Sequence, residues 1–379
     1  MIRLPAIRGH MGEREYFTTS VGMGELLRIV RYQEDNAPVN EAFSRQRKLN
    51  LKRVKNEMVP YLQQNSDHFY NSLVVEHLRE AGNDHAVRFQ PLEGQGDIGW
   101  VELDGTETLE TLDGQHRLKS IEMAIKDCPS LRAESISLVI VPHKDVASSQ
   151  QMFSDLNRYA KHTSKSQTVV FDHRGPVEFW TKQLAKRSDY LRGRVNMSGT
   201  SSSKAHITTA STLFDAINIL KPLLPAGDDR EANALALQDY FDVAFKVLPG
   251  FEKDVQKNKG MASLKGDYLY AHPIGFLALA EVIKGAVNNY PMDWRDFLTD
   301  AIPAVGWELT NPQWEGIAIV AGRIMAGGGP RYRTATFIKW LLGLPVDIKQ
   351  LEDMKSIHEK MGKALPEPIR FKAGLRLAK

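Results

Sequence analysis

The periodicity of the apolar residues changes once along this chain, near residue 175, and that change limits the folds that it can adopt. Before residue 175, short runs rich in β-branched residues, such as ISLVIVPH, alternate with segments of helical spacing. After it, segments such as EANALALQDYFDVAFKVL and PIGFLALAEVIKGAVNN have helical periodicity, and no convincing strand intervenes. The pattern predicts an α+β domain over residues 1–175 and a largely α-helical domain over residues 176–379.

The strands predicted for the first domain are short and separated by turns or helices. A strand over residues 16–21 is followed by a helix over residues 23–35, MGELLRIVRYQED. GWVEL and TETLETL are expected to form a hairpin about Asp104–Gly105, because Asp-Gly is a strong turn signal. ISLVIVPH is nearly continuously apolar, which is typical of a buried strand. The remaining predicted elements are the strands FYNSLVVEHL and VRFQPL and a helix, VASSQQMFSDLNRYAK, that Asp145 caps.

The stretch LDGQHRLKSI, residues 112–121, lies where the second strand of that hairpin meets a helix. Its glycine lets the backbone turn tightly and lets a ligand approach closely. Asp113 is placed to cap the helix. The polar residues then lie in the first turn, beside amide donors and the positive end of the helix dipole, where a phosphate or another anion can bind. The motif predicts an anion pocket that includes Asp113, Gly114, Gln115, His116 and Arg117.

Two alternatives stay open at this motif. The same five residues fit a structural helix that Asp113 caps, with a solvated arginine. His116, in a helix first turn, is expected to have a lowered pKa, which suits a neutral hydrogen-bond acceptor or base. A histidine that only hydrogen-bonds the neighbouring strand fits the position as well.

A run of cations with no acidic residue among them lies between Arg45 and Lys55. The apolar residues from Leu51 to Leu62 recur at helical spacing, which predicts an amphipathic helix that Pro60 kinks or interrupts. The net charge of the whole chain is only +3, so any nucleic-acid binding must depend on such local clustering. A solvated basic face is the alternative. The predicted DNA-binding residues are Arg45, Arg47, Lys48, Lys52, Arg53 and Lys55.

Two loops of the second domain are further candidates for phosphate contact. The Ser/Gly-rich loop Asn196–His206 offers hydroxyls and a lysine, although a plain flexible loop is the alternative. The loop Ala326–Thr334, AGGGPRYRT, exposes backbone amides and places two arginines about a tyrosine, which suits a phosphate or a stacked base. It lacks the Lys-Ser/Thr ending of a nucleoside triphosphatase loop, so a turn between helices is the alternative. The secondary phosphate-contact candidates are Lys204, Arg331 and Arg333.

Composition excludes several other classes of protein. The single cysteine, Cys128, excludes an internal disulfide and Cys-based zinc fingers. The eleven histidines show no ligand spacing, so we predict no structural metal. No stretch approaches the ~20 apolar residues that span a bilayer, and the N-terminus lacks the apolar core of a signal peptide. We therefore expect a cytoplasmic protein with no membrane partner.

Taken together, REYFTTSV, LDGQHRLKSI, ISLVIVPH and MFSDLNRYAK resemble the DGQHR-domain proteins, and in particular the DndB family encoded with bacterial DNA sulfur-modification (phosphorothioation) systems. The resemblance implies a core similar to the ParB and sulfiredoxin superfamily, in which the motif in this place starts a helix and contacts nucleotide phosphates. The stretch that aligns with the second phosphate motif of ParB, E-N-x-x-R, is Ser154–Arg158, which adds Asp155, Asn157 and Arg158 to the pocket. Serine replaces the glutamate of that motif, which puts metal-dependent nucleotide binding in doubt. Gln115 stands where sulfiredoxin chemistry needs a cysteine, so sulfinic acid reduction is not predicted.

The resemblance also implies a function, because DndB proteins bind promoter DNA of their own modification gene cluster and repress it. The expected partners are double-stranded DNA from the promoter of its own operon, proteins of the modification system and a second copy of the chain. The resemblance implies no certain cofactor; a nucleotide with Mg²⁺ is the candidate ligand of the pocket.

Two other hypotheses remain. An enzyme that hydrolyses a nucleotide or cleaves DNA would use Asp113, His116, Arg117, Asp155 and Asn157 as a general base and metal site near a bound phosphate. The absence of a complete phosphate-binding loop, of HExxH and of a two-carboxylate site argues against it, and no catalytic residue is predicted. A scaffold that docks the modification enzymes through its helical half is the third hypothesis.

Overall fold

The computed structural model describes residues 1–31, 49–79, 87–103, 107–158, 164–199, 205–225, 227, 229–251, 261–369 and 371. The chain forms two compact units, residues 1–161 and residues 162–379. The predicted fold class is confirmed: strands and helices make up the first unit, and helices dominate the second. The two units divide before helix α6 (Lys165–Phe171), which the sequence pattern had placed with the first domain.

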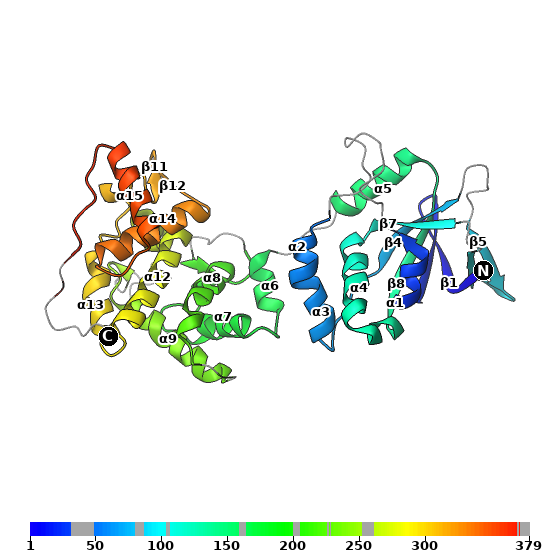
Figure 1. Ribbon diagram of the computed structural model, residues 1–379, viewed down its shortest axis with the longest axis horizontal. Helices are drawn as coiled ribbons and strands as arrows, with labels where there is room; N and C mark the ends of the chain where they lie inside the picture. Colours follow the sequence, from blue (N-terminus) through cyan, green and yellow to red (C-terminus); the bar gives the residue numbers. More distant parts are fainter. Residues whose placement is uncertain are drawn as a thin grey trace. The chain divides into compact units, whose positions relative to one another are not determined.

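In the described residues of the first unit, the strands form an eight-stranded sheet with the order β3-β7-β4-β8-β2-β1-β6-β5. Figure 1 labels β1, β4, β5, β7 and β8 of this sheet. Most neighbours are antiparallel, but β4 runs parallel to β8, and β3 runs parallel to β7. The predicted buried strand is β8, in the middle of the sheet between β4 and β2. The strands are β1 (Ile2–Met11), β2 (Arg14–Gly22), β3 (Val30–Arg31), β4 (Leu73–Arg79), β5 (Arg88–Leu92), β6 (Gln95–Leu103), β7 (Glu107–Asp113) and β8 (Ser135–Pro142).

The predicted hairpin between GWVEL and TETLETL is wrong. In the described residues, β6 pairs with β1 and β5, whereas β7 pairs with β3 and β4. The turn signal Asp104–Gly105 lies outside the described residues. The hairpin that β6 does form is with β5, across Glu93–Gly94, where Gly94 has a φ of +74°. An Asp-Gly pair favours a tight turn, but non-local side-chain packing decides which strands become partners.

The helices of the first unit pack on the sheet. Helix α1 (Met23–Ile29) is shorter than the predicted helix over residues 23–35, because the backbone becomes extended at Val30 and joins the sheet as β3. The rest of that prediction, residues 32–35, lies outside the described residues. The other helices are α2 (Leu51–Arg53), η2 (Val54–Met58), α3 (Val59–Gln64), α4 (Gln115–Asp127), η3 (Pro129–Ala133) and α5 (Val146–Arg158).

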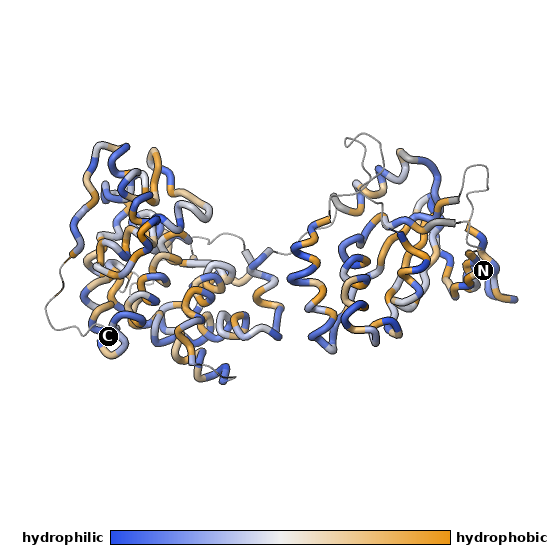
Figure 2. Tube along the Cα trace, in the orientation of Figure 1, coloured by the Kyte–Doolittle hydropathy of each residue, from blue (hydrophilic) through white to orange (hydrophobic). Residues whose placement is uncertain are grey.

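The elements α2, η2 and α3 form one continuous helix that lies along α4 (Figure 1). The predicted interruption at Pro60 occurs as a π turn just before it: the backbone N–H of Val59 donates to the carbonyl of Val54, five residues earlier. Val54 and Leu62 are buried in the same core as the apolar face of α4, and Figure 2 shows hydrophobic and hydrophilic residues alternating along this helix. Leu51 is an exception to the predicted inward face, because it begins the helix and stays 46% exposed.

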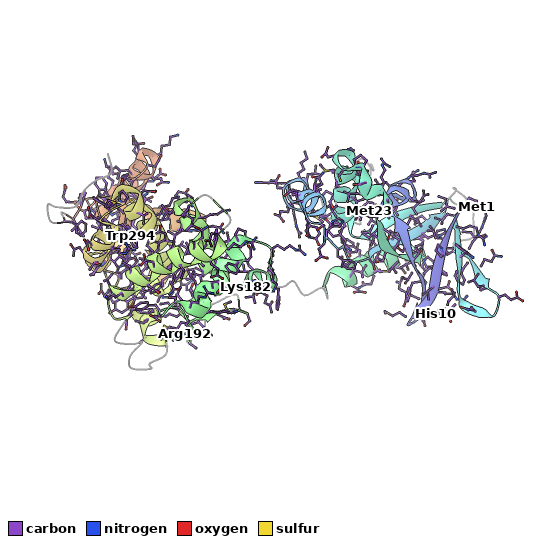
Figure 3. The ribbon with its side chains drawn as sticks, turned by 90° about the horizontal axis from the view of Figure 1, so that it is seen from below. Met1, His10, Met23, Lys182, Arg192 and Trp294 are labelled. Carbon is purple, nitrogen blue, oxygen red and sulfur yellow. The ribbon has the colours of Figure 1, made fainter. Side chains whose placement is uncertain are left out.

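The second unit is built around α12 (Pro273–Asn289), whose side chains are buried on nearly all sides. Trp294, labelled in Figure 3, is buried where α13 (Trp294–Ala304) meets α9 (Arg230–Lys246). Its ring packs against Tyr240, and the guanidinium of Arg295 lies 4.4 Å from the ring centre. No helix in the described part of the chain is long and apolar enough to cross a membrane. The elements are α6, α7 (Pro176–Arg187), α8 (Ala210–Leu220), η4 (Lys221–Leu223), α9 (Arg230–Lys246), α11 (Ala262–Asp267), η5 (Leu269–Ala271), α12 (Pro273–Asn289), α13 (Trp294–Ala304), η6 (Pro312–Trp314), α14 (Gly328–Leu341), α15 (Ile348–Lys360) and the two-residue strands β9 (Val195–Asn196), β10 (Thr208–Thr209), β11 (Ile319–Val320) and β12 (Arg323–Ile324).

Candidate functional site

The DGQHR motif forms the junction between β7 and α4. Asp113 is the last residue of β7, and Gly114 stands at the N-cap position of α4 with a φ of +99°. A Cβ at Gly114 would lie 2.3 Å from Cδ2 of Leu73, so both the backbone conformation and the space require glycine. Among the residues that the structure describes, no side chain caps this helix. The predicted cap by Asp113 is therefore wrong, because Gly114 occupies that position and the carboxylate binds Arg117 instead.

The guanidinium of Arg117 is bound to protein acceptors on two sides. Its Nη1 lies 2.9 Å from the carbonyl and 2.6 Å from Oδ1 of Asn71, and 2.5 Å from the carbonyl of Ser72. Its Nη2 donates to Oδ2 of Asp113 at 2.5 Å. Asn71 and Ser72 directly precede β4, so Arg117 ties the start of β4 to the end of its neighbour β7. The Arg117 side chain is only 13% exposed, so it is not the solvated arginine that the alternative of a purely structural helix predicted.

His116 hydrogen-bonds Asn50, the N-cap residue of the continuous helix formed by α2, η2 and α3, which we call the basic helix. Its Nε2 accepts the backbone N–H of Asn50 at 3.0 Å, which requires the neutral ring with its proton on Nδ1. Burial lowers the pKa of His116, and the positive charge of Arg53 lowers it further. The predicted lowered pKa is confirmed in direction, although its causes are burial and Arg53 rather than the helix terminus. The hydrogen-bond partner of His116 is a residue at the start of a helix and not one of the neighbouring strand.

The second candidate motif lies on α5, which packs against β7. Asp145 caps α5 as predicted, because its Oδ1 accepts the backbone N–H of Ser148 at 2.8 Å. Asp155 accepts a hydrogen bond from Gln151, one turn earlier on the same helix. Asn157 and Arg158 are part of α5, but their side chains lie outside the described residues. Gln115 is half-buried in the first turn of α4. Thus, the structure places both motifs against β7, while their joint binding of a nucleotide stays a prediction.

A buried polar cluster that the sequence analysis missed lies at the carboxyl ends of the parallel strands β4 and β8. Glu76 of β4 is 1% exposed, and its Oε1 lies 2.7 Å from Nδ1 of His143, just after β8. The buried hydroxyl of Ser149, on α5, also donates to this carboxylate. The signal in the sequence was a glutamate inside an apolar strand, VVEHL, because an unpaired carboxylate is rarely buried. This Glu76 cluster (Glu76, His143 and Ser149) fastens α5 to the sheet.

The described part of the basic segment faces solvent. Lys52, Arg53 and Lys55 are exposed, whereas Val54 between them is fully buried, so the predicted amphipathic pattern is confirmed here. Arg53 lies 3.6 Å from the carboxylate of Glu57, and both side chains are exposed, so this pair is weak. Arg45, Arg47 and Lys48 lie outside the described residues.

The glycine-rich candidate loop begins α14 in the second unit. Gly327 has a φ of +101°, and no atom of the described residues lies within 4 Å of an added Cβ at Gly327, Gly328 or Gly329. Arg331 and Arg333 are half-buried on this helix, and Tyr332 is exposed. Lys204 lies outside the described residues. Among the residues that the structure describes, no group of three or more His, Cys, Asp or Glu side chains could hold a metal ion.

A family model described as DndB, DNA-sulfur modification-associated, matches residues 4–345. The match covers the sheet except for the first two residues of β1, and most of the helical unit. No curated protein and no solved structure matches this chain.

Proposed function

This chain belongs to the DndB family of DNA-sulfur modification-associated proteins, and from that premise we propose that it binds duplex DNA and represses the gene cluster of a DNA phosphorothioate-modification system. The observation that carries the proposal is the exposed basic face of the α2–η2 helix. We call Lys52, Arg53 and Lys55 the basic face. Arg45, Arg47 and Lys48 belong to the same charge run in the sequence and are proposed to contact DNA as well.

The basic face suits phosphate contact for two physical reasons. Its cations project from a helix whose opposite side, at Val54 and Leu62, is buried against α4, so a rigid element presents them. Lysine and arginine that neutralise DNA phosphates release counterions, and this release supplies most of the sequence-independent affinity. Such contacts fix the position of a protein on the duplex, while contacts to base edges set specificity.

Nucleotide hydrolysis or DNA cleavage at the DGQHR motif has less support. The groups that would contact a phosphate there are bound to the protein itself: Arg117 to Asn71, Ser72 and Asp113, and His116 to Asn50. An anion that took these two side chains as ligands would have to displace hydrogen bonds that join β4, β7 and the start of α2.

The test is fluorescence-anisotropy titration of a labelled duplex from upstream of the protein's own gene cluster, with random duplex as competitor, at several salt concentrations. The variant Lys52→Ala/Arg53→Ala/Lys55→Ala is expected to bind more weakly and to reduce the slope of log K against log salt by about 0.9 for each phosphate that is no longer neutralised. The matched control, Lys349→Ala/Lys355→Ala/Lys360→Ala, removes the same charge from exposed positions on α15 and is expected to retain the slope. Binding no tighter than to random duplex would refute the repressor, and release of phosphate from a nucleotide would favour the enzyme.

A further inference from the structure

We propose that His116 is a positioning residue for DNA binding: by accepting the backbone N–H of Asn50, it holds the first turn of the basic helix in place. The inference rests on the DNA-binding function proposed above. It gives the DGQHR motif a role that needs no ligand, because the motif then orders the surface that meets the phosphates.

Asn50 is the residue through which His116 acts on the helix. Its backbone N–H donates to Nε2 of His116 at 3.0 Å. Its side-chain Oδ1 accepts the N–H of Arg53 at 3.1 Å, and its carbonyl accepts the N–H of Val54 at 3.1 Å. The backbone N–H of Asn50 is therefore bound to α4, while its side-chain Oδ1 and its carbonyl accept the first N–H groups of the basic helix. Holding Asn50 in place consequently holds the first turn of that helix in place.

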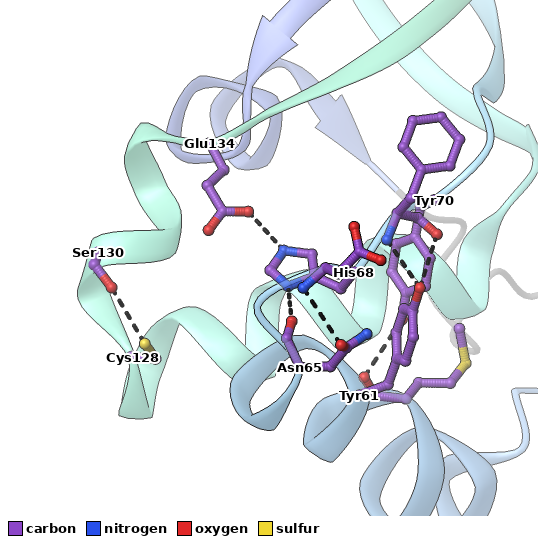
Figure 4. A network of polar contacts seen from close by, with 10 residues as sticks. Tyr61, Asn65, His68, Tyr70, Cys128, Ser130 and Glu134 are labelled. Carbon is purple, nitrogen blue, oxygen red and sulfur yellow. Dashed lines mark hydrogen bonds and ion pairs between the residues drawn. The ribbon is translucent and has the colours of Figure 1, made fainter. Parts of the chain in front are cut away.

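The far end of the same helix has its own attachments. The hydroxyl of Tyr70 lies 3.4 Å from the carbonyl of Met58 and 3.1 Å from Oγ of Ser120 on α4. Beyond α3, His68 bonds to the carbonyl of Asn65 through Nδ1 at 2.7 Å and lies 2.6 Å from Glu134 through Nε2 (Figure 4). These contacts hold the segment from Met58 onward.

The basic face lies at the other end, where a helix is most prone to fray. The first turn of a helix has N–H groups without helical partners, and free ends open more readily than the middle. Lys52 and Arg53 are in this first turn, and burial of Val54 begins only after them. Ordering of these two cations therefore depends on the cap at Asn50 and on its bond to His116.

The electrostatics of His116 support the same role. Its lowered pKa, from burial first and then from Arg53, keeps the ring neutral at physiological pH, so Nε2 has a lone pair to accept with. Protonation would remove that acceptor and would place a second positive charge beside Arg53.

Two substitutions separate the hydrogen bond from the bulk of the ring. His116→Gln keeps an acceptor near the position of Nε2, whereas His116→Leu fills the space without one. His272→Leu is the control, because Nε2 of His272 also hydrogen-bonds backbone, at the carbonyl of Lys265 in the second unit.

Hydrogen exchange over residues 50–58 and salt-dependent DNA titration are the two measurements. His116→Leu is expected to exchange the amides of Asn50–Val54 faster and to lower the salt slope by about 1.8, which corresponds to two phosphate contacts. His116→Gln and His272→Leu are expected to match the wild type in both. Unchanged exchange and slope in His116→Leu, or equal reductions in the glutamine and leucine variants, would overturn the proposal.

The wild-type protein gives a test that does not depend on the folding of any variant. Long-range ¹⁵N–¹H correlation spectra of histidine-labelled protein are expected to show His116 neutral at about pH 7.5 with its proton on Nδ1. A proton on Nε2 would overturn the hydrogen bond. Failure of the wild type to bind duplex DNA would refute the proposed function itself, and the exchange and tautomer results would then decide separately whether His116 holds the helix.

Discussion

Arg117 donates from Nη2 to Oδ2 of Asp113 at 2.5 Å, and this ion pair closes the junction at which β7 turns into α4. The same guanidinium reaches the carbonyls of Asn71 and Ser72 before β4. One side chain therefore joins two adjacent strands and a helix. The arginine of the DGQHR motif has a structural role whether or not the motif also binds an anion.

Arg117→Ala is expected to lower the free energy of unfolding by about 2–4 kcal/mol, because it leaves Asp113 and two backbone carbonyls without their charged donor. Arg117→Lys is expected to restore only part of this, since an ammonium cannot reproduce the planar fork of a guanidinium. Urea denaturation measures both. The comparison is Arg28→Ala, which breaks an exposed pair with Glu25 and should cost less than about 1 kcal/mol. Similar costs for Arg28→Ala and Arg117→Ala would contradict this role.

Gly114→Ala is expected to cost about 2–4 kcal/mol of unfolding free energy, from a strained backbone and a clash with the buried Leu73 side chain. Gly94→Ala provides the matched comparison. Gly94 also has a positive φ, of +74°, but nothing in the described part of the chain lies within 4 Å of the added Cβ, so only the backbone cost of about 1–2 kcal/mol applies. Thermal or urea unfolding distinguishes the two. Equal costs would mean that Leu73 moves aside freely.

His143→Ala is expected to destabilise the protein by about 3–5 kcal/mol, because it removes a partner from the nearly fully buried carboxylate of Glu76. Glu76→Gln should cost less, since it removes the charge and keeps an oxygen acceptor for Ser149. The double variant should be less destabilised than the sum of the two single variants, because the buried charge that makes His143→Ala costly is gone. A double-mutant cycle in urea measures this coupling. Additive costs would show that the imidazole and the carboxylate do not stabilise one another.

The sequence predicts those parts of this fold that depend on residues close together in the chain, such as helix caps and apolar runs. The cap of Asp145 on α5 and the apolar run of β8 needed no distant partner to be recognised. The pairing of β6 and β7 did need one. Asp104–Gly105 favours a turn between β6 and β7, but β6 pairs with β1 and β7 pairs with β4. Both β1 and β4 are distant from this turn in the sequence.

The candidate site likewise has features that local sequence predicts and features that depend on residues distant in the chain. The exposed cations about a buried Val54 follow from helical periodicity alone. The partners of the DGQHR side chains do not: Asn71 is 46 residues from Arg117, and Asn50 is 66 residues from His116. The predicted cap of α4 by Asp113 is wrong for a local reason. A glycine that can adopt a positive φ lets the chain turn one residue later than an aspartate cap requires, and this frees Asp113 for Arg117.

The stability of the protein is expected to depend on pH through His116. The pKa of His116 is lowered in the folded protein from 6.5, so the unfolded chain binds its proton more tightly than the folded one. The stability from this neutral residue is fully present above pH 6.5 and is lost as the pH falls from there through the folded pKa. Burial lowers the pKa of His206 and His272 in the same direction, so the wild type alone cannot isolate the effect.

The comparison is therefore between the wild type and His116→Gln, which share every other histidine. The glutamine variant does not titrate, so it is expected to lose less stability than the wild type between about pH 8 and pH 5. Urea unfolding at closely spaced pH values gives the difference between the two proteins, which should develop below pH 6.5 and not above it. Parallel curves for the two proteins would mean that His116 is as free to take a proton in the fold as in the unfolded chain, and that its bond to Asn50 does not hold the ring neutral.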